Sequence, residues 1–234
     1  MKKYTHIISE RLTGRHKRCM QLCGVKGKRI LNIGCSFGWF EMFALKNGCK
    51  EIIGVDTGIN DLKDAKNKVK DNRVKFLQAS ALNLSQFKNN YFDLVTLFDV
   101  IEHIPKNTEM KCLLEVKRVL KKNGELIIST PNSSFFSNLL DPAWYFGHRH
   151  YSKNKLNQIL NKSGFKCVEY TYGGGFYEIF AMILLYIFKW IFRYEIPFKK
   201  WFDEKRDNEY ISSKNNVFTT LFVKAIFQDK DVKE

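Results

Sequence analysis

This sequence lacks three features: cysteines in paired spacing, the apolar core of a signal peptide, and enough acidic residues to balance its basic ones. Its six cysteines lack CxxC spacing: Cys19, Cys23, Cys35, Cys49, Cys112 and Cys167. Cys19 and Cys23 can be neighbours on a helix, but two thiols without further ligands make a poor zinc site. The N-terminal stretch MKKYTHIISERLTGRHKR has no apolar core. We therefore expect a cytoplasmic protein with reduced thiols.

Acidic residues are scarce relative to basic ones, with 24 Asp and Glu against 39 Lys and Arg and a net charge of +15. Such an excess favours an acidic partner, either nucleic acid, an anionic lipid surface or a phosphorylated substrate. A lysine-rich, solvated surface explains the same charge equally well. The sequence has no nucleic-acid-binding signature, so we do not expect nucleic acid as a partner.

Short apolar strands alternate with helical patterns from residue 28 onward, which predicts an α/β fold with a mostly parallel sheet. The stretch 91–100 is almost continuously apolar, as in a strand covered on both faces. Residues 108–124 have helical spacing and end at Gly124, while Ser152 and Gly164 bound a further helix. With no repeat and no low-complexity linker, we expect one domain over 1–234. A helical segment at 1–27 precedes the sheet, and an insertion at 173–216 precedes the last strand, 217–227.

The motif GCSFG at 34–38 follows the first strand directly. Gly34 and Gly38 allow a tight turn and a close approach of the backbone to a ligand. The motif does not match the dinucleotide fingerprint G-x-G-x-x-G. Asp56, about twenty residues further on, ends the second strand with a carboxylate suited to ribose hydroxyls. Both features lie at the carboxyl edge of the expected sheet, where such folds bind ligands.

Five motifs carry a resemblance to a known family: ILNIGCSFGWF, IIGVDTG, VKFLQASALNL, FDLVTLFDVIEHI and LKKNGELIISTPN. Their order and spacing resemble the class I S-adenosylmethionine-dependent methyltransferases, over residues 28–172 and again over 217–227. Within that superfamily the chain looks most like the branch of the ubiquinone-biosynthesis O-methyltransferases. The resemblance implies a doubly wound, seven-stranded, Rossmann-like sheet, S-adenosylmethionine as cofactor and an oxygen as methyl acceptor.

The resemblance also implies a set of cofactor-binding residues, position by position. They are Gly34, Cys35, Ser36 and Gly38 around the amino-acid portion, Asp56 and Thr57 at the ribose, Ser80 and Ala81 near the adenine, and Phe98 over the methionine end.

Three positions depart from the family pattern. Asn32 stands where the family usually has an acid, so its contact to the cofactor's amino group would lose charge. Ser36 replaces a middle glycine, a change that a negative φ at this residue would tolerate. Ser80 replaces a common Asp at the adenine and keeps a hydrogen-bonding group.

Two further motifs supply candidate catalytic residues. In DVIEHIP, Asp99, Glu102 and His103 follow the fourth strand, where a base or a divalent metal would help an acceptor hydroxyl to lose its proton. The alternative is that this turn only fixes the loop geometry, and we predict no metal. In GHRHYS, His148 or His150 can face the acceptor, and we assign His150 with Glu102 and His103. A histidine that caps the following helix is the alternative.

Near the N-terminus, Arg15 and Arg18 can reach the cofactor carboxylate, although we expect both to be solvated.

The apolar run FYEIFAMILLYIFKWIF at 176–192 is the longest in the chain. A single membrane crossing would strand the last β-strand on the wrong side, and the run is marginal in length for a span. On one continuous helix, Glu178, Tyr186, Lys189 and Arg193 would project within about 80° of one another. We expect a lid that docks on the inner face of a membrane, with a dimer contact or a lid packed on the protein as alternatives.

The sequence therefore predicts a methyltransferase for a small-molecule or lipid-linked acceptor, such as a glycan or a quinone precursor. Two alternatives remain open: a non-catalytic cofactor-binding or membrane scaffold protein, and an RNA methyltransferase suggested only by the charge.

Overall fold

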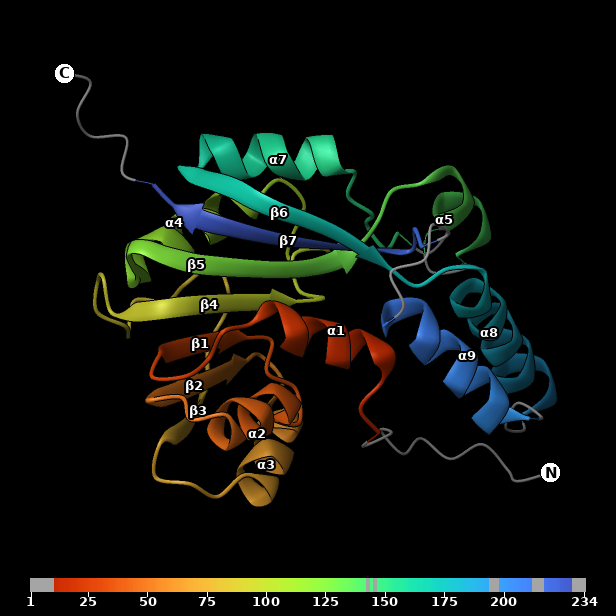
Figure 1. Ribbon diagram of the computed structural model, residues 1–234, viewed down its shortest axis with the longest axis horizontal. Helices are drawn as coiled ribbons and strands as arrows, with labels where there is room; N and C mark the ends of the chain where they lie inside the picture. The colour runs from red at the N-terminus through yellow and green to blue at the C-terminus, as the bar shows by residue number, and fades with distance from the viewer. Residues whose placement is uncertain (1–10, 142–143, 145–146, 194–197, 212–216, 229–234) are drawn as a thin grey trace.

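The computed structural model describes residues 11–141, 144, 147–193, 198–211 and 217–228 (Figure 1). Its seven strands have the order β3-β2-β1-β4-β5-β7-β6. They are β1 Arg29–Ile33, β2 Glu51–Asp56, β3 Val74–Gln78, β4 Phe92–Phe98, β5 Leu120–Pro131, β6 Phe165–Gly173 and β7 Thr220–Phe227. All neighbours pair in parallel except β7, which is antiparallel to both β5 and β6. The expected seven-stranded, mostly parallel sheet is confirmed.

Helices cover both faces of this sheet. They are α1 Gly14–Leu22, α2 Trp39–Lys46, α3 Ile59–Lys68, α4 Glu109–Val119, α5 Phe135–Leu140, α7 Lys153–Lys162, α8 Phe176–Ile187 and α9 Lys199–Ile211. Successive residues of β1 alternate between two cores, since Leu31 packs with α4 and α7 while Ile30 packs with α1, α2 and α3. Buried side chains on both faces explain why the strands read as apolar runs.

Two expected helix boundaries are confirmed and one is wrong. The side chain of Ser152 caps α7, and Gly164 follows this helix with a φ of 86°. The helix expected at 108–124, however, ends at Val119. Leu120 already pairs with Phe92 of β4, so strand pairing ends the helix before Gly124.

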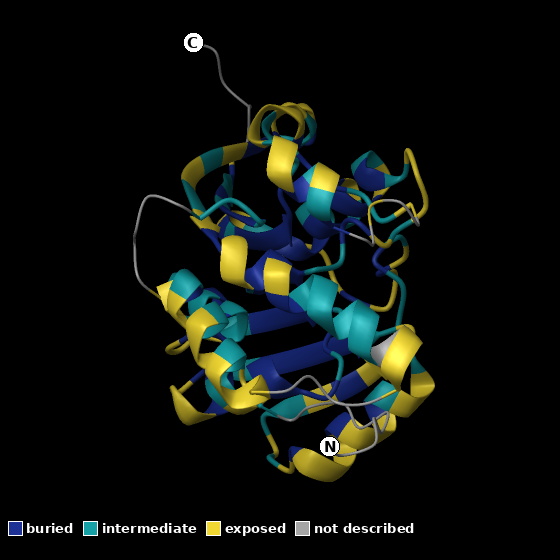
Figure 2. Cartoon of the chain, turned by 90° about the vertical axis from the view of Figure 1, so that its right-hand side faces the viewer, coloured by how far each residue is buried: buried dark blue, intermediate teal, exposed yellow. Residues whose placement is uncertain are grey.

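The segment between β6 and β7 lies beyond the carboxyl edge of the sheet (Figure 1). It contains α8, a π-helical turn Phe188–Phe192 and α9, which contacts α1 and α8. Figure 2 faces this end of the molecule, with the dark-blue strands behind partly exposed helices. Of the N-terminal segment expected at 1–27, residues 1–10 lie outside the described residues. Among the described helices, none is long and apolar enough to cross a membrane.

The polar stripe expected along the apolar run does not form. Glu178 is buried and accepts hydrogen bonds from Nε and Nη2 of Arg206 on α9, at 2.8 and 3.0 Å. The α-helix ends at Ile187, and Arg193 has a φ of 57°. Because the helical repeat is interrupted between these residues, Arg193 cannot share one α-helical face with Glu178.

Candidate active site

The turn after β1 requires glycine at its first position. Gly34 has a φ of 78°, and a Cβ there would lie 2.4 Å from Cγ2 of Val100. The backbone N–H groups of Gly34 and Cys35 both donate to the carbonyl of Val55 in β2. Gly38 also has a positive φ, of 84°. The two glycines therefore hold the start of α2 close to the ends of β1 and β2, as the sequence predicts.

Asp56 is bonded to this turn through its carboxylate. Oδ2 accepts a hydrogen bond from the backbone N–H of Ser36 at 2.9 Å, and Oδ1 accepts one from Gly58 at 2.9 Å. Ser36 has a φ of 47°, so the negative φ that would make serine easy to accommodate at this position is not adopted. The Asp56 carboxylate stabilises this left-handed conformation, because it accepts a hydrogen bond from the backbone amide of Ser36. A partly exposed carboxylate beside a glycine turn can accept hydrogen bonds from the hydroxyls of a ribose.

The other residues expected at the cofactor have different surroundings. Cys35 is fully buried, so only its backbone faces the turn, and Thr57 is exposed. The Ser80 hydroxyl accepts from the N–H of Leu82 at 3.2 Å, and Ala81 is buried. Phe98 is also buried and packs against Trp39 and Phe40, with ring centroids 5.5 and 5.1 Å away.

Asn32 belongs to a buried polar chain. Its Nδ2 donates to Oε1 of Glu41 at 2.9 Å, and its Oδ1 accepts from the Thr96 hydroxyl at 2.8 Å. Glu41 is fully buried, and burial raises its pKa to about 8, although the hydrogen bond from Asn32 opposes the shift. A carboxyl group therefore does lie near the glycine turn, but it comes from α2 and not from position 32.

Arg15 is only partly exposed and bonds within the protein, whereas a solvated side chain was expected. Its guanidinium donates to Oδ2 of Asp99 at 3.0 Å and to the hydroxyl of Tyr210, and it lies 3.6 Å from Glu178. Burial would raise the pKa of Asp99, but Arg15 outweighs it and holds that pKa below the usual value. Arg15 thus joins α1 to the end of β4 and to both helices of the insertion. Arg18 instead bonds Gln21 at the surface.

Glu102 is buried at the turn after β4. Its Oε2 accepts from the Thr130 hydroxyl at 3.1 Å, and its Oε1 has no hydrogen-bond partner. Burial, followed by the nearby Asp99 carboxylate, raises the pKa of Glu102 to about 8. Glu102 is therefore largely protonated at neutral pH, which makes it a poor general base in the free protein.

His103 forms a close pair with His148 across the mouth of the site. Their Nε2 atoms are 3.4 Å apart, and one ligand atom from each lies within 4.8 Å of a Glu102 oxygen. This group has the chemistry of a divalent-cation site. The alternative reading, a turn of fixed geometry, has its own support, because Arg149 donates to the carbonyls of Ile101 and Glu102.

His150 is buried, and both of its ring nitrogens are engaged. Nδ1 lies 2.9 Å from Oδ1 of Asn138, and Nε2 lies 3.0 Å from Oδ2 of Asp141. In this arrangement His150 has no free nitrogen for an acceptor. His148 does, since its Nδ1 is buried without a hydrogen-bond partner, and burial followed by His103 lowers its pKa. The alternation of histidines in GHRHYS indicated the pair, but not which member would be free.

Two cavities meet beneath the insertion. One, of about 130 Å³, lies between α8 and the ends of β5 and β7, and is lined by His148, His150 and Ile179 among others. The other, of about 370 Å³, lies between α1, α8 and α9 and is lined by His16 and Asp99. Both cavities are also lined by Arg15, Glu178 and Met182. The insertion therefore covers the carboxyl edge of the sheet beside β4.

In sequence, the chain is similar to known methyltransferases. The Methyltransf_11 family, described as a methyltransferase domain, matches residues 31–128. Phosphoethanolamine N-methyltransferase 2 of Caenorhabditis elegans is 30% identical over 149 residues, 61% of this chain and 33% of that enzyme. Ubiquinone biosynthesis O-methyltransferase of Coxiella burnetii is 27% identical over 122 residues, 52% of this chain and 51% of that enzyme. The matched region thus spans between a third and about half of these relatives.

The fold has close counterparts among solved structures. An S-adenosylmethionine-dependent methyltransferase from Mesorhizobium loti superposes with a TM-score of 0.64 at 18% identity, covering 91% of this chain and 97% of that one. The motifs, the sheet and the sequence relatives together identify a class I S-adenosylmethionine-dependent methyltransferase domain in this chain, with S-adenosylmethionine as the methyl donor.

Proposed function

We propose that this protein transfers the methyl group of S-adenosylmethionine to an oxygen of a lipid-linked acceptor that binds beneath α8. The observation that carries the proposal is the pair of cavities under the insertion, which place His148 and Arg15 beside the end of β4. This is the edge of the sheet at which Gly34 and Asp56 also lie.

The bound donor would supply an electrophilic methyl group on its sulfonium. The chain's own part is to hold the reactants and to take up a proton. Asp56 would hold the ribose and the turn 34–38 the amino-acid portion of the donor, and the Arg15–Asp99 pair would orient the opposite end of the site. His148, neutral because its pKa is lowered, would accept the acceptor's proton at Nδ1. Covering by α8 would exclude water and position the acceptor for in-line attack.

A labelling experiment tests this function. The purified protein is incubated with methyl-labelled S-adenosylmethionine and a solvent extract of lipids from its own source. We expect label in the lipid phase with the unmodified protein and none with Asp56→Ala. Failure of the purified protein to bind the donor at all would contradict the proposal and favour a scaffold role.

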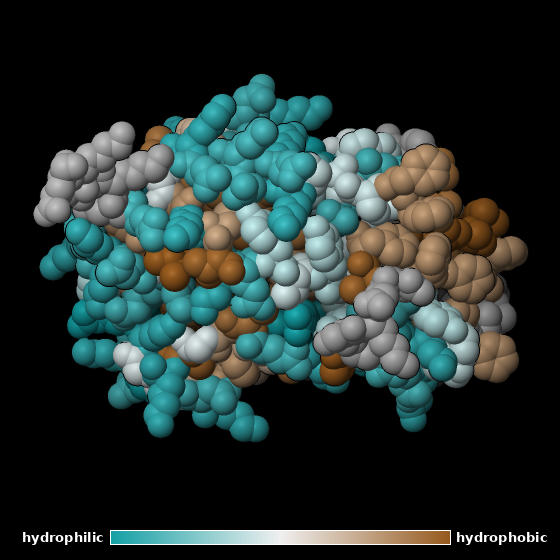
Figure 3. All heavy atoms as spheres, turned by 45° about the horizontal axis from the view of Figure 1, so that its top comes forward, coloured by the Kyte–Doolittle hydropathy of each residue, from teal (hydrophilic) through white to brown (hydrophobic). Residues whose placement is uncertain are grey.

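Membrane docking is supported by the surface of the insertion. Large apolar side chains gather at one end of the molecule (Figure 3). Each of the following is at least 40% exposed: Phe135, Phe136, Leu139, Phe176, Tyr177, Phe180, Ile191, Phe192, Phe198 and Trp201. Exposed apolar side chains that gather on one surface are typical of protein or membrane interaction sites.

The charges of α9 favour an anionic membrane. Three of its four acids bond within the protein, while Glu204 is exposed: Asp203 and Asp207 pair with Arg11, and Glu209 accepts from the backbone N–H groups that begin α8. The exposed charged side chains beside Phe198 and Trp201 include Lys200 and Lys205, together with Lys199, which pairs with Asp203 at 2.7 Å. Aromatic and lysine side chains on one helix are typical of helices that lie at a membrane interface.

Vesicle binding should therefore depend on these aromatics. We expect the protein to sediment with phosphatidylglycerol vesicles, and Phe198→Ser/Trp201→Ser to weaken binding by about tenfold or more, since each ring loses its buried area. Leu114→Ser, at an exposed leucine of α4, serves as the matched control. If the protein with its apolar run intact does not bind these vesicles, the membrane-docking proposal is wrong. Dimer dissociation by the same pair of substitutions, in sedimentation velocity, would assign the surface to a second copy.

A further inference from the structure

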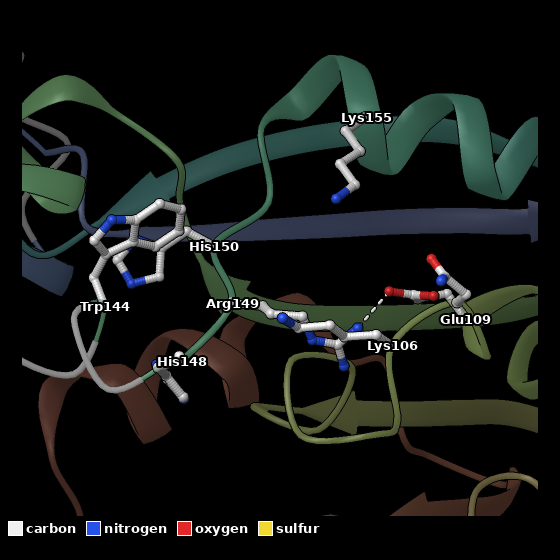
Figure 4. A pocket seen from close by; sticks show the side chains of 9 residues that line it. Lys106, Glu109, Trp144, His148, Arg149, His150 and Lys155 are labelled. Carbon is white, nitrogen blue, oxygen red and sulfur yellow. Dashed lines mark hydrogen bonds and ion pairs between the residues drawn. The ribbon is translucent and has the colours of Figure 1, made fainter.

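A third cavity lies on the outer side of the segment that carries the histidines. It has a volume of about 370 Å³, and its walls include Lys106, Arg149 and Lys155 (Figure 4). His148 lines both this cavity and the smaller one beneath α8. At one end, Trp144 packs against His150, with ring centroids 4.9 Å apart. The cavity therefore adjoins the candidate active site without sharing its charged Arg15–Glu178 lining.

The charge of this cavity is unbalanced. Three cationic side chains line it, and Glu109 is the one carboxylate in its described lining. That carboxylate already has two partners within the protein, because it forms an ion pair with Arg149 and accepts a hydrogen bond from the Tyr151 hydroxyl at 2.7 Å. Arg149 in turn donates hydrogen bonds to Glu109 and to the carbonyls of Glu102, Ile101 and Ile104.

The two lysines therefore supply the available donors. In the part of the chain that the structure describes, neither ammonium group forms an ion pair. Lys155 projects from α7 into the cavity, and its Nζ lies 5.2 Å from the centre of the Tyr151 ring. Lys106 extends alongside Arg149 from the loop before α4 (Figure 4). The lining keeps a net charge of +2, counting Arg149, Lys106 and Lys155 against Glu109.

We propose that this cavity binds a phosphate dianion, held by the ammonium groups of Lys106 and Lys155. Lysine is a common phosphate ligand, and the net charge of +2 on the lining is opposite and equal to that of a phosphate monoester dianion. Because His148 separates this cavity from the one beneath α8, the phosphate belongs to the methyl acceptor. This last assignment rests on the proposed function, whereas phosphate binding itself does not.

Calorimetry with the full chain tests the site. Inorganic phosphate is titrated at low, constant ionic strength, because surface charge interactions weaken with salt. We expect saturable binding that Lys106→Ala/Lys155→Ala weakens about tenfold or more. Lys153→Ala is the matched control: it lies on the same helix but over the Tyr170 ring and outside this cavity, and it should leave the affinity unchanged. Absence of saturable binding, or equal affinity in the double variant, overturns the proposal.

Two further measurements have different purposes. One identifies the source of the phosphate, and the other tests the anion site independently of the proposed function. Octyl phosphate that binds more tightly than inorganic phosphate assigns the site to a lipid-borne group, and equal affinities assign it to a soluble phosphate. S-adenosylmethionine affinity is measured for each variant and should not change. If the protein binds phosphate but transfers no methyl group, the anion site is supported and the proposed methyltransferase function is wrong. If it methylates lipid but binds no phosphate, the proposed function is supported and the anion site is wrong.

Discussion

Asp56→Ala is expected to weaken S-adenosylmethionine binding about 100-fold. The carboxylate ends β2 at the edge of the sheet and already accepts hydrogen bonds from the amides of Ser36 and Gly58. Its loss would remove the proposed bonds to the ribose and would also release the Ser36 amide that shapes the turn. Hydrogen bonds to a charged group contribute about 1.5–3 kcal/mol each, so two such losses account for the change. Isothermal titration calorimetry measures it.

Two variants show whether charge or folding causes the effect. Asp56→Asn keeps an acceptor oxygen without the charge and should fall between the parent and alanine. Asp64→Ala, an exposed acid on α3, should bind the donor normally. An unchanged calorimetric affinity for Asp56→Ala, in a protein that melts like the parent, would refute this assignment of the cofactor site.

Glu178→Ala should lower the free energy of unfolding by about 3 kcal/mol, because removing one partner of a buried ion pair leaves the other charge uncompensated. The buried carboxylate of Glu178 holds Arg206 through two hydrogen bonds and lies 3.6 Å from Arg15. Both guanidinium groups would then repel each other beneath the insertion. Urea denaturation at pH 7 measures the loss.

The effect should also depend on pH with a definite sign. Burial would raise the pKa of Glu178, but Arg206 outweighs it, and the pKa lies below its ordinary value of 4.5. A depressed carboxyl pKa adds stability that is present above pH 4.5 and is lost as the pH falls through the folded-state value. Glu178→Gln should therefore flatten this part of the acid limb of the stability curve.

A compensating double variant separates the ion pair from mere packing. Glu178→Met/Arg206→Met removes both charges of the pair and should recover part of the stability lost by Glu178→Ala. Glu204→Ala, at an exposed acid of α9, should change stability by less than about 0.5 kcal/mol. Equal losses in the single and double variants would show that the charges do not couple.

Local spacing in the sequence is sufficient to predict the sheet and the glycine turn at its carboxyl edge. The glycine turn at 34–38, Asp56 at the end of β2 and the caps of α7 are each specified by residues close together in the chain. The same holds for β7, which pairs over Thr220–Phe227 within the strand expected at 217–227, because its apolar pattern favours burial in the sheet. These features follow from backbone conformation and strand patterning, which act over a few residues.

The ion pairs between distant parts of the chain could not be predicted from local spacing. No local pattern joins Arg15 to Asp99, Tyr210 and Glu178, since these residues come from four elements that meet only when α9 packs on α1. In the same way, Asn138 and Asp141 engage both nitrogens of His150 and leave His148 free.

Thus the sequence by itself determined the α/β class, the methyltransferase motifs and the place of the insertion. Only the tertiary structure decided which histidine is free, where the buried charges pair and which surfaces stay apolar, because burial and pairing depend on neighbours that are distant in the chain.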